Sequence, residues 1–331
     1  MEAGTIPAPG DERRSIRWLR QLQSTPWVPV YVAIVVLFIA SRWMVGASFA
    51  TLHNFWSIAV LGSFVAVVGA GQGLVILTGG IDLSVPWVIT LGGIMTTRLT
   101  QGDNTPLVWV LPLTLAVGVA VGVVNGLGVV ALRISPVIFT IAMNAIIEGV
   151  VLVVTGGTPK GSAPPALRQL MHSDLPGGVP VIVPALVLFA VVVGVLMSQT
   201  VAGKRAYAVG NGDLVSRLSG VRVGAVLIGV YAFSGLTAVL TGVLLTGYAS
   251  QSYLGMGDDY LLPSIAAVVL GGASIIGGRG HYTGTLGGAI LLSLLTSVLT
   301  SLSISEAARE IIFGGLILLA VLTVRERAHG G

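Results

Sequence analysis

Two carboxylates stand inside long apolar stretches of this sequence, and they are the side chains best placed to do chemistry. Asp82 follows Gly79 and Gly80 in "LTGGIDLSV", and Glu148 lies in "TIAMNAIIEGVVLVV". A carboxylate at the centre of a membrane costs roughly 2.5–3.5 kcal/mol, so each one needs a partner or a function. The glycines let the chain leave helical geometry, and "Asp-Leu-Ser", ending at Ser84, is typical of a helix start. Asp82 is therefore predicted either to cap the helix that follows or to contact a solute directly.

Glu148 is predicted to have a structural partner, either Asn144 one helical turn earlier or a basic group on a neighbouring helix. A carrier driven by protons or sodium would bury more ionisable groups than these two. The sequence has no GxxxxGK[ST] phosphate-binding loop and no recognisable nucleophile motif. If transport is active, its energy is expected to come from another subunit, and no enzymatic chemistry is expected on this chain.

Residue types that bind metals or cofactors are scarce. There is no cysteine, which excludes disulfides and thiolate metal sites. The histidines are scattered, without HxxH or HExxH spacing: His53, His172, His281 and His329. We therefore expect no metal and no cofactor. The net charge of +4 is explained by the basic cytoplasmic loops of a membrane protein, so no nucleic-acid partner is expected.

The composition assigns the chain to a class. Only 9% of the residues are charged and 54% are hydrophobic, and the mean hydropathy is +0.95. Soluble domains have roughly 25% charged residues. The 46 glycines also favour a membrane protein, because small residues let membrane helices pack closely. The chain is predicted to be an integral membrane protein in contact with lipid.

The elements that must position the carboxylates are apolar helices. A spanning helix needs about 20 residues, and turn signals divide the chain into about ten segments: 27–46, 55–78, 83–99, 107–132, 136–155, 180–199, 223–247, 261–277, 283–302 and 309–324. The apolar runs lack the period-2 alternation of β-barrel strands. The predicted fold class is all-α, a polytopic membrane helix bundle of about ten transmembrane segments.

The basic residues predict the orientation of this bundle. Most Lys and Arg residues fall in loops on one side when the N-terminus is placed in the cytoplasm. Outer loops then carry acidic residues, among them Asp258 and Asp259. We expect both termini in the cytoplasm, with 1–26 and 325–331 as tails and 27–324 as the transmembrane domain.

The long inner loop, 203–222, contains a candidate docking helix. Asn211 and Asp213 lie in a helix-start signal, "NGD". An apolar stripe follows over about two turns, at Leu214, Val215 and Leu218. Two interpretations are open: a short amphipathic helix that docks a partner, or a basic loop that lies against the lipid headgroups.

Two further stretches are rich in glycine or proline. The long outer loop, 155–180, is predicted to form an external cap. Arg279 follows Gly277 and Gly278 in a turn at the inner surface. This arginine either docks a partner or lipid phosphates, or only contributes to the positive charge of the inner loops.

Residues 77–93 and 270–292 show a weak internal repeat, which we call the echo. Both stretches place paired glycines before and after an interruption between apolar runs. Paired glycine-interrupted spans in the two halves of a transporter indicate its central pathway. Glycine is abundant enough here for such an echo to arise by chance, and both interpretations stay open.

Four stretches occur in order along the chain: "LTGGIDLSV", "VNGLGVVALRISPVIFTIA", "GKRAYAVGNGDLVSRLSGV" and "IAAVVLGGASIIGGRGHYTGTLGGAILL". Together they resemble the membrane permease subunits of bacterial ABC importers of the ribose/xylose/arabinose type. The resemblance runs from about residue 55 to 324. It implies a transmembrane pathway for a monosaccharide or related polyol, with no covalent chemistry on this chain. Branched-chain amino-acid permeases share the wider superfamily and are the alternative, and a proton-coupled secondary carrier is a more distant one.

The resemblance also implies partners and a location. The permease would form a homodimer or heterodimer in the bacterial inner membrane, driven by a cytosolic ABC ATPase and fed by a periplasmic or lipid-anchored sugar-binding protein. The broken span would line the translocation route, at Gly79, Gly80, Asp82 and Ser84. A coupling helix for the ATPase would comprise Asn211, Asp213, Leu214, Val215, Arg217, Leu218 and Gly220. Two features depart from the family pattern: the loop reads "NGDLVSRLSG" where acidic residues and alanines are common, and Pro86 stands where glycine is usual.

Overall fold

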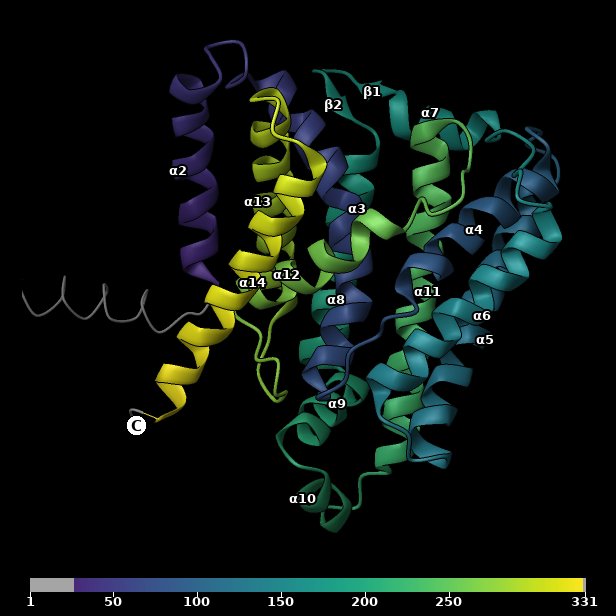
Figure 1. Cartoon of the computed structure of the whole chain (residues 1–331), viewed down its shortest axis with the longest axis vertical. Coiled ribbons are helices and arrows are strands. Elements are labelled where there is room, and N and C mark those ends of the chain that lie inside the picture. Colours follow the sequence, from purple (N-terminus) through teal and green to yellow (C-terminus); the bar gives the residue numbers. More distant parts are fainter. Residues whose placement is uncertain (1–26, 330–331) are drawn as a thin grey trace, which may run out of the picture.

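The computed structural model describes residues 27–329, which form a helix bundle (Figure 1). The predicted tail 1–26 lies outside the described residues. The long apolar stretches form α2 (Val28–Met44), α3 (Leu52–Leu77), α4 (Val85–Thr100), α5 (Leu107–Ala131), α6 (Pro136–Thr155), α8 (Ile182–Gln199), α11 (Val223–Ala249), α12 (Leu261–Leu270), α13 (Tyr282–Ser301) and α14 (Glu306–His329). Each of the ten predicted segments therefore falls on a helix.

Shorter elements connect these helices. They are α7 (Pro165–His172), α9 (Val201–Asn211), α10 (Asp213–Leu218), the 3-10 turn η1 (Asp258–Tyr260), and two strands, β1 (Asp174–Leu175) and β2 (Val179–Pro180), which pair antiparallel. The strand pair and α7 lie in the predicted outer loop. α7 packs on α11, and Ala163 N–H donates to Ser250 O at 3.0 Å just beyond the end of that helix. The loop is therefore a structured cap.

Within residues 27–329, six helices are long and apolar enough to cross a membrane by length and composition: α3, α5, α6, α8, α11 and α13. The prediction of a helical membrane bundle is confirmed at this level. By contrast, α4 has 16 residues and α12 has 10, which is short of the roughly 20 that a span needs. α4 and α12 each begin after a break in the chain, and α12 also ends early, at Leu270.

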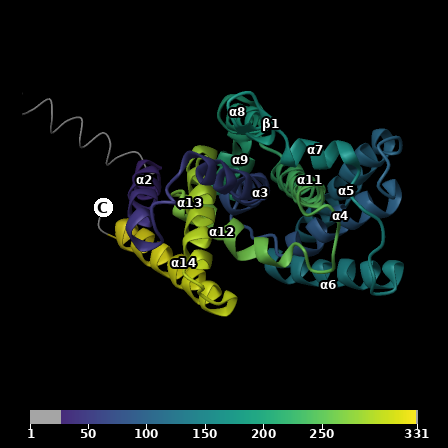
Figure 2. The same ribbon diagram turned by 90° about the horizontal axis from the view of Figure 1, so that it is seen from above.

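The centre of the bundle is built on α3 and α11, which contact each other and most of their neighbours (Figure 2). Of the 18 residues that form the apolar stretch of α3, 89% are buried, whereas 22% are buried in the corresponding stretch of α5. Glycine permits the closest approaches. A Cβ on Gly122 of α5 would collide with the carbonyl oxygen of Tyr231 in α11, and one on Gly242 of α11 with that of Ile89 in α4.

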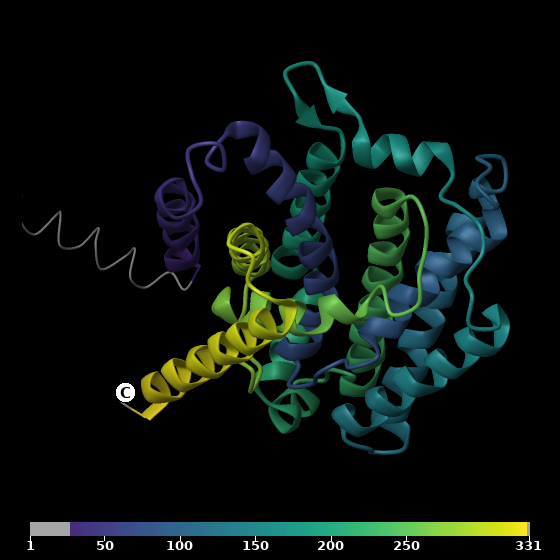
Figure 3. The same ribbon diagram turned by 45° about the horizontal axis from the view of Figure 1, so that its top comes forward.

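The chain contains two units in which a long helix is followed by a non-helical break and then by a short helix. α3 is followed by α4, and α11 is followed by η1 and α12; the two units run in opposite directions (Figures 1 and 3). η1 packs against α3 and α4, so Asp258 and Asp259 lie on a segment that folds back among the helices instead of in a simple outer loop. The predicted echo at 270–292 is not this second break, because that stretch spans the turn between α12 and α13.

Two predicted helix ends differ from the structure. The segment 261–277 was expected to be helical throughout, but α12 ends at Leu270, and Gly272 follows with a φ of 90°. Residues 271–281 instead form the turn that leads into α13. At the other end of the chain, α14 continues past residue 324 to His329.

Candidate functional site

The break between α3 and α4 starts at the predicted glycines. α3 ends at Leu77, Gly79 has a φ of 80°, and residues 80–84 have no regular secondary structure. A Cβ on Gly80 would collide with the Tyr231 hydroxyl of α11. Glycine is therefore needed at the first position for its backbone conformation and at the second for close packing.

Asp82 lies in this break and is 1% exposed. Its Oδ1 accepts hydrogen bonds from the Ser84 backbone N–H at 3.0 Å and from the Ser84 hydroxyl at 2.6 Å. Its Oδ2 accepts one from the Ser234 hydroxyl of α11 at 2.7 Å. The carboxylate thus ties the start of the short helix to the central helix α11.

The helix-capping prediction needs a correction in register. α4 begins at Val85, and its N-cap residue is Ser84, which makes no capping bond with its own side chain. Asp82 stands two residues earlier and holds Ser84 instead. Direct contact with a solute is blocked in this conformation, because the carboxylate is buried and both of its oxygens are occupied by protein donors.

α6 supplies the remaining caps of α4. Thr140 Oγ1 accepts from the Leu83 N–H at 3.0 Å, and Asn144 Oδ1 accepts from the Trp87 N–H at 3.3 Å. Asn144 therefore serves α4 and not Glu148, so that predicted pair is wrong. The Glu148 carboxylate makes no hydrogen bond or ion pair with any other residue in the described part of the chain. Sequence reasoning missed Thr140 as a site residue; its one signal was a polar side chain in an apolar helix.

The polar network at the break has unused hydrogen-bonding capacity. Asn125 of α5 donates from Nδ2 to the Ser84 hydroxyl at 2.8 Å, but its Oδ1 is buried with no partner among residues 27–329. In the same described part of the chain, the Tyr231 hydroxyl beside Gly80 is also buried and unpartnered, as are both amide atoms of Gln72, earlier on α3. Each such group costs about 1–3 kcal/mol. Within residues 27–329, no three His, Asp or Glu side chains are grouped to hold a metal ion, so this network offers hydrogen bonds alone.

The predicted coupling segment is two helices and not one. Asn211 is the last residue of α9, Gly212 breaks the chain with a φ of 156°, and α10 begins at Asp213. The predicted helix-start signal "NGD" contains this start, with Gly212 as the N-cap residue and Asp213 as the first residue of α10. Gly220, with a φ of 79°, follows α10. Arg217 approaches Asp213 to 3.9 Å, a surface ion pair that contributes little.

The apolar stripe of α10 points away from the protein. Leu214 is 72% exposed, Val215 67% and Leu218 81%. Large apolar side chains that gather on one face of a helix at such exposure mark an interaction surface or a membrane contact. We call these three residues the α10 stripe.

The glycine-rich turn after α12 connects α9 to the break. Gly278 N–H donates to the carbonyl oxygen of Leu77, the last residue of α3, at 2.9 Å. Asn211 Nδ2 donates to Gly278 O at 3.4 Å and to Tyr207 O at 2.8 Å, and the Tyr207 hydroxyl donates to Gly280 O at 2.5 Å. Arg279 itself is exposed. Residues 77–79, 207–211 and 277–280 thus meet in one place, which we call the junction.

The junction is packed so closely that only glycine fits at its centre. A Cβ on Gly210 would collide with Leu77 O, and Gly277 has a φ of 98°. α10 follows directly after this packed region, and the Asp82 break begins directly after Leu77. α10 is therefore joined through Gly212 alone to a closely packed region that contacts the end of α3, directly before the break.

Known proteins resemble this chain over most of its length. Residues 54–321 match the family model described as branched-chain amino acid transport system / permease component. The ribose import permease protein RbsC of Escherichia coli strain K12 is 34% identical over 308 residues, which cover 92% of this chain and 94% of that protein. RbsC of Bacillus subtilis strain 168 is 33% identical, over 79% and 81% of the two chains.

A fructose import permease protein, FrcC of Rhizobium meliloti, is also similar. It is 30% identical over 307 residues, which cover 91% of this chain and 85% of that protein. No solved structure matches this chain. These relatives are named for two different sugars, so the similarity extends across more than one substrate.

Proposed function

This chain belongs to the family of branched-chain amino acid transport system permease components, and on that premise we propose that it is the permease subunit of an ABC importer for a monosaccharide or related polyol. The similarity to ribose and fructose import permeases over most of the chain supports the substrate class. The protein would provide the route through the membrane, and ATP hydrolysis would take place on partner subunits.

The observation that carries this proposal is the α10 stripe together with the junction. A partner that binds the α10 stripe would bury three apolar side chains that are more than two-thirds exposed in this chain, Leu214, Val215 and Leu218. Burial of apolar area is the main driving force of association. A cytosolic ATPase is the partner that suits an importer, and Arg217 and Asp213 would lie at the rim of that contact.

Movement of α10 would reach the translocation route through the junction. The junction binds α9 to the last carbonyl of α3, and the Asp82 network holds the start of α4 against α11. Unpaired polar groups at Asn125 and Tyr231 would be available to accept new partners when α4 shifts. ATP-driven closure of the ATPases would thereby favour one of two states of the route, which is how alternating access is coupled to a ligand.

The same proposal specifies the membrane orientation of the chain and the subunits that it binds. The ten apolar helices would cross or enter the bacterial inner membrane, with both termini in the cytoplasm and α10 on that side. Two permease chains would pair, and a periplasmic or lipid-anchored sugar-binding protein would deliver the solute to the end that carries β1 and β2.

A branched-chain amino-acid substrate is the second candidate, because the family description names that class. A proton-coupled carrier finds no support at the first break. Its essential carboxylate would need access to water, whereas Asp82 is buried with both oxygens occupied.

Co-purification tests the proposal. The tagged chain is expressed with candidate ATPase and sugar-binding subunits, as wild type and with Leu214, Val215 and Leu218 all changed to Asp. The ATPase should co-purify with the wild type and be lost from the triple variant. Leu175→Asp, an exposed apolar residue in β1, is the matched control and should retain the ATPase. Absence of any ATPase together with uptake that follows a proton gradient would contradict the proposal.

A further inference from the structure

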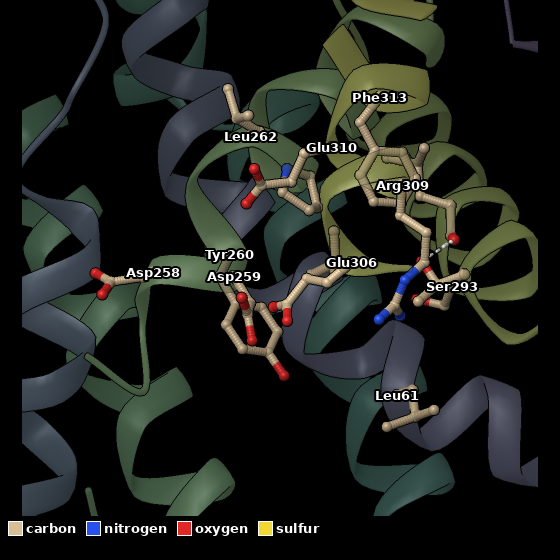
Figure 4. Close-up of a pocket in the computed structure, with 14 residues that line it drawn as sticks. Leu61, Asp258, Asp259, Tyr260, Leu262, Ser293, Glu306, Arg309, Glu310 and Phe313 are labelled. Atoms are coloured by element: carbon tan, nitrogen blue, oxygen red, sulfur yellow. Dashed lines mark hydrogen bonds between the residues drawn. The ribbon is translucent and has the colours of Figure 1, made fainter. Parts of the chain in front are cut away.

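A cavity lies beside the second break, between η1, α3, α12, α13 and the start of α14 (Figure 4). Its volume is ≈ 280 Å³, close to the lower end of the roughly 300–1,000 Å³ of small-molecule sites. Leu61 and Leu292 line it near the middle of α3 and α13. The cavity extends from the middle of these two helices toward the end of α13 and the start of α14, where Thr296 and Glu306 line it.

The polar lining of this cavity is mostly acidic: Asp258, Asp259, Glu306 and Glu310, with Arg309 as the one basic residue among the lining residues. Figure 4 shows Asp259 and Glu306 side by side, with the Arg309 guanidinium beyond Glu306. All four acidic residues are exposed on this single chain. Carboxylates facing lipid at this depth would be costly, so this face is expected to meet water, a solute or protein.

One buried polar side chain in the cavity wall lacks a partner. Ser293 of α13 lines the cavity and is 6% exposed, and its hydroxyl makes no hydrogen bond within residues 27–329. Arg309 uses Nη1 to donate to the Thr300 hydroxyl at 2.9 Å. Buried polar groups are normally satisfied, so the Ser293 hydroxyl points to a polar occupant of the cavity.

The chemistry of the lining specifies that occupant. Carboxyl oxygens accept hydrogen bonds, so four carboxyl groups suit a ligand with several hydroxyl donors. Four carboxylates against one guanidinium repel an anion. A metal ion is disfavoured, because these carboxylates do not form a group that could hold one. Tyr260 and Phe313 add aromatic surface against which the apolar face of a sugar ring can pack.

We propose that this cavity binds the transported solute as an uncharged polyhydroxylated molecule, and that its carboxylates exclude anions such as phosphorylated sugars and sugar acids. This rests on the proposed import function. The proposal adds the place where the solute contacts the permease. It also makes the permease itself select uncharged solutes over anions.

The absence of cysteine makes the test direct, because a single introduced cysteine is the only thiol in the chain. Ser293→Cys places a thiol in the cavity wall at almost the same size. The complete importer carrying this variant is treated with a cationic (trimethylammonium-ethyl) and an anionic (sulfonatoethyl) methanethiosulfonate reagent. Leu175→Cys in β1 is the control for the intrinsic reactivity of the two reagents, and Thr296→Cys is a second cavity position.

The cationic-to-anionic rate ratio at Ser293→Cys should exceed that at Leu175→Cys about tenfold or more, as expected for a charge-lined cleft. Adding Asp259→Asn and Glu306→Gln should reduce this excess several-fold. Of D-ribose and D-fructose, the sugar that cells expressing the wild-type importer take up should slow labelling of the cavity cysteine. D-ribose 5-phosphate should not slow it.

Equal rate ratios at Ser293→Cys, Thr296→Cys and Leu175→Cys would overturn the charge selection. Unslowed labelling while the sugar is taken up would overturn the cavity as the binding place. Slowing by an amine such as spermidine and not by the sugar would likewise overturn it, in favour of a cation site. Failure of the wild-type importer to take up either sugar would count against the proposed function, whereas the rate ratio would still report on the cavity.

Discussion

The chain breaks after α3 and again after α11, and the two breaks use their carboxylates in opposite ways. At the first break, Asp82 is buried and bonded to Ser84 and Ser234. At the second, Asp258 and Asp259 are exposed beside a cavity. A saturated, buried carboxylate fixes the structure, whereas an open, under-partnered one is available to a ligand. The first break thus positions the start of α4 against α11, and in our proposal the second break, with a similar backbone arrangement, binds the solute.

The largest expected difference between the two breaks is in stability. Asp82→Ala leaves the Ser84 N–H, the Ser84 hydroxyl and the Ser234 hydroxyl without their acceptor, which should lower the free energy of unfolding by about 3 kcal/mol or more. Asp259→Ala removes an exposed side chain and should change it by less than about 0.5 kcal/mol. Thermal inactivation of the purified variants in detergent measures both. Equal losses would mean that the two carboxylates do not differ in role.

A smaller effect is expected where the two breaks touch. Gly257 N–H donates to the Thr90 hydroxyl of α4 at 3.2 Å, and a Cβ on Gly257 would collide with Pro86 O. Gly257→Val should therefore destabilise the protein by about 1–3 kcal/mol through overpacking. Gly149→Val in α6, where a Cβ meets no atom within 4 Å, is the control. If both variants melt alike, the contact between the breaks carries no stability.

The smallest stability losses are expected at the two α6 residues that accept hydrogen bonds from the start of α4. Asn144→Ala and Thr140→Ala each remove an acceptor from the start of α4, and each should cost about 1 kcal/mol. Glu148→Gln on the same helix should cost nothing measurable, because its carboxylate has no partner in the described chain. The same thermal assay applies. A large loss for Glu148→Gln would indicate a partner supplied by a second subunit.

Local sequence signals predicted much of the first break. Paired glycines located it, and apolar runs bounded by turn signals located the helices on each side. The partners of the break could not be read, because Ser234 lies 152 residues from Asp82 and Asn144 lies 57 residues from Trp87. The predicted Asn144–Glu148 pair failed for the same reason: a local neighbour was preferred to a distant backbone N–H.

The second break and its cavity were harder to predict. Asp258 and Asp259 look like ordinary outer-loop residues, and only the fold brings them beside Glu306 at the start of α14. The coupling segment lies between these cases. Its apolar stripe was readable from spacing, but the role of Asn211 at the end of α9 depends on the distant turn at Gly278.

The central claim, that the junction carries movement of α10 to the break, is tested most directly by uncoupling it. The combined change Tyr207→Phe and Asn211→Ala removes the hydrogen bonds that tie α9 to the turn and leaves the α10 stripe intact. ATPase co-purification and ATP-dependent sugar uptake are measured for the complete importer, with Lys204→Ala on the exposed face of α9 as the control. We predict normal ATPase binding with uptake reduced several-fold. Unchanged uptake with the ATPase bound would contradict the account.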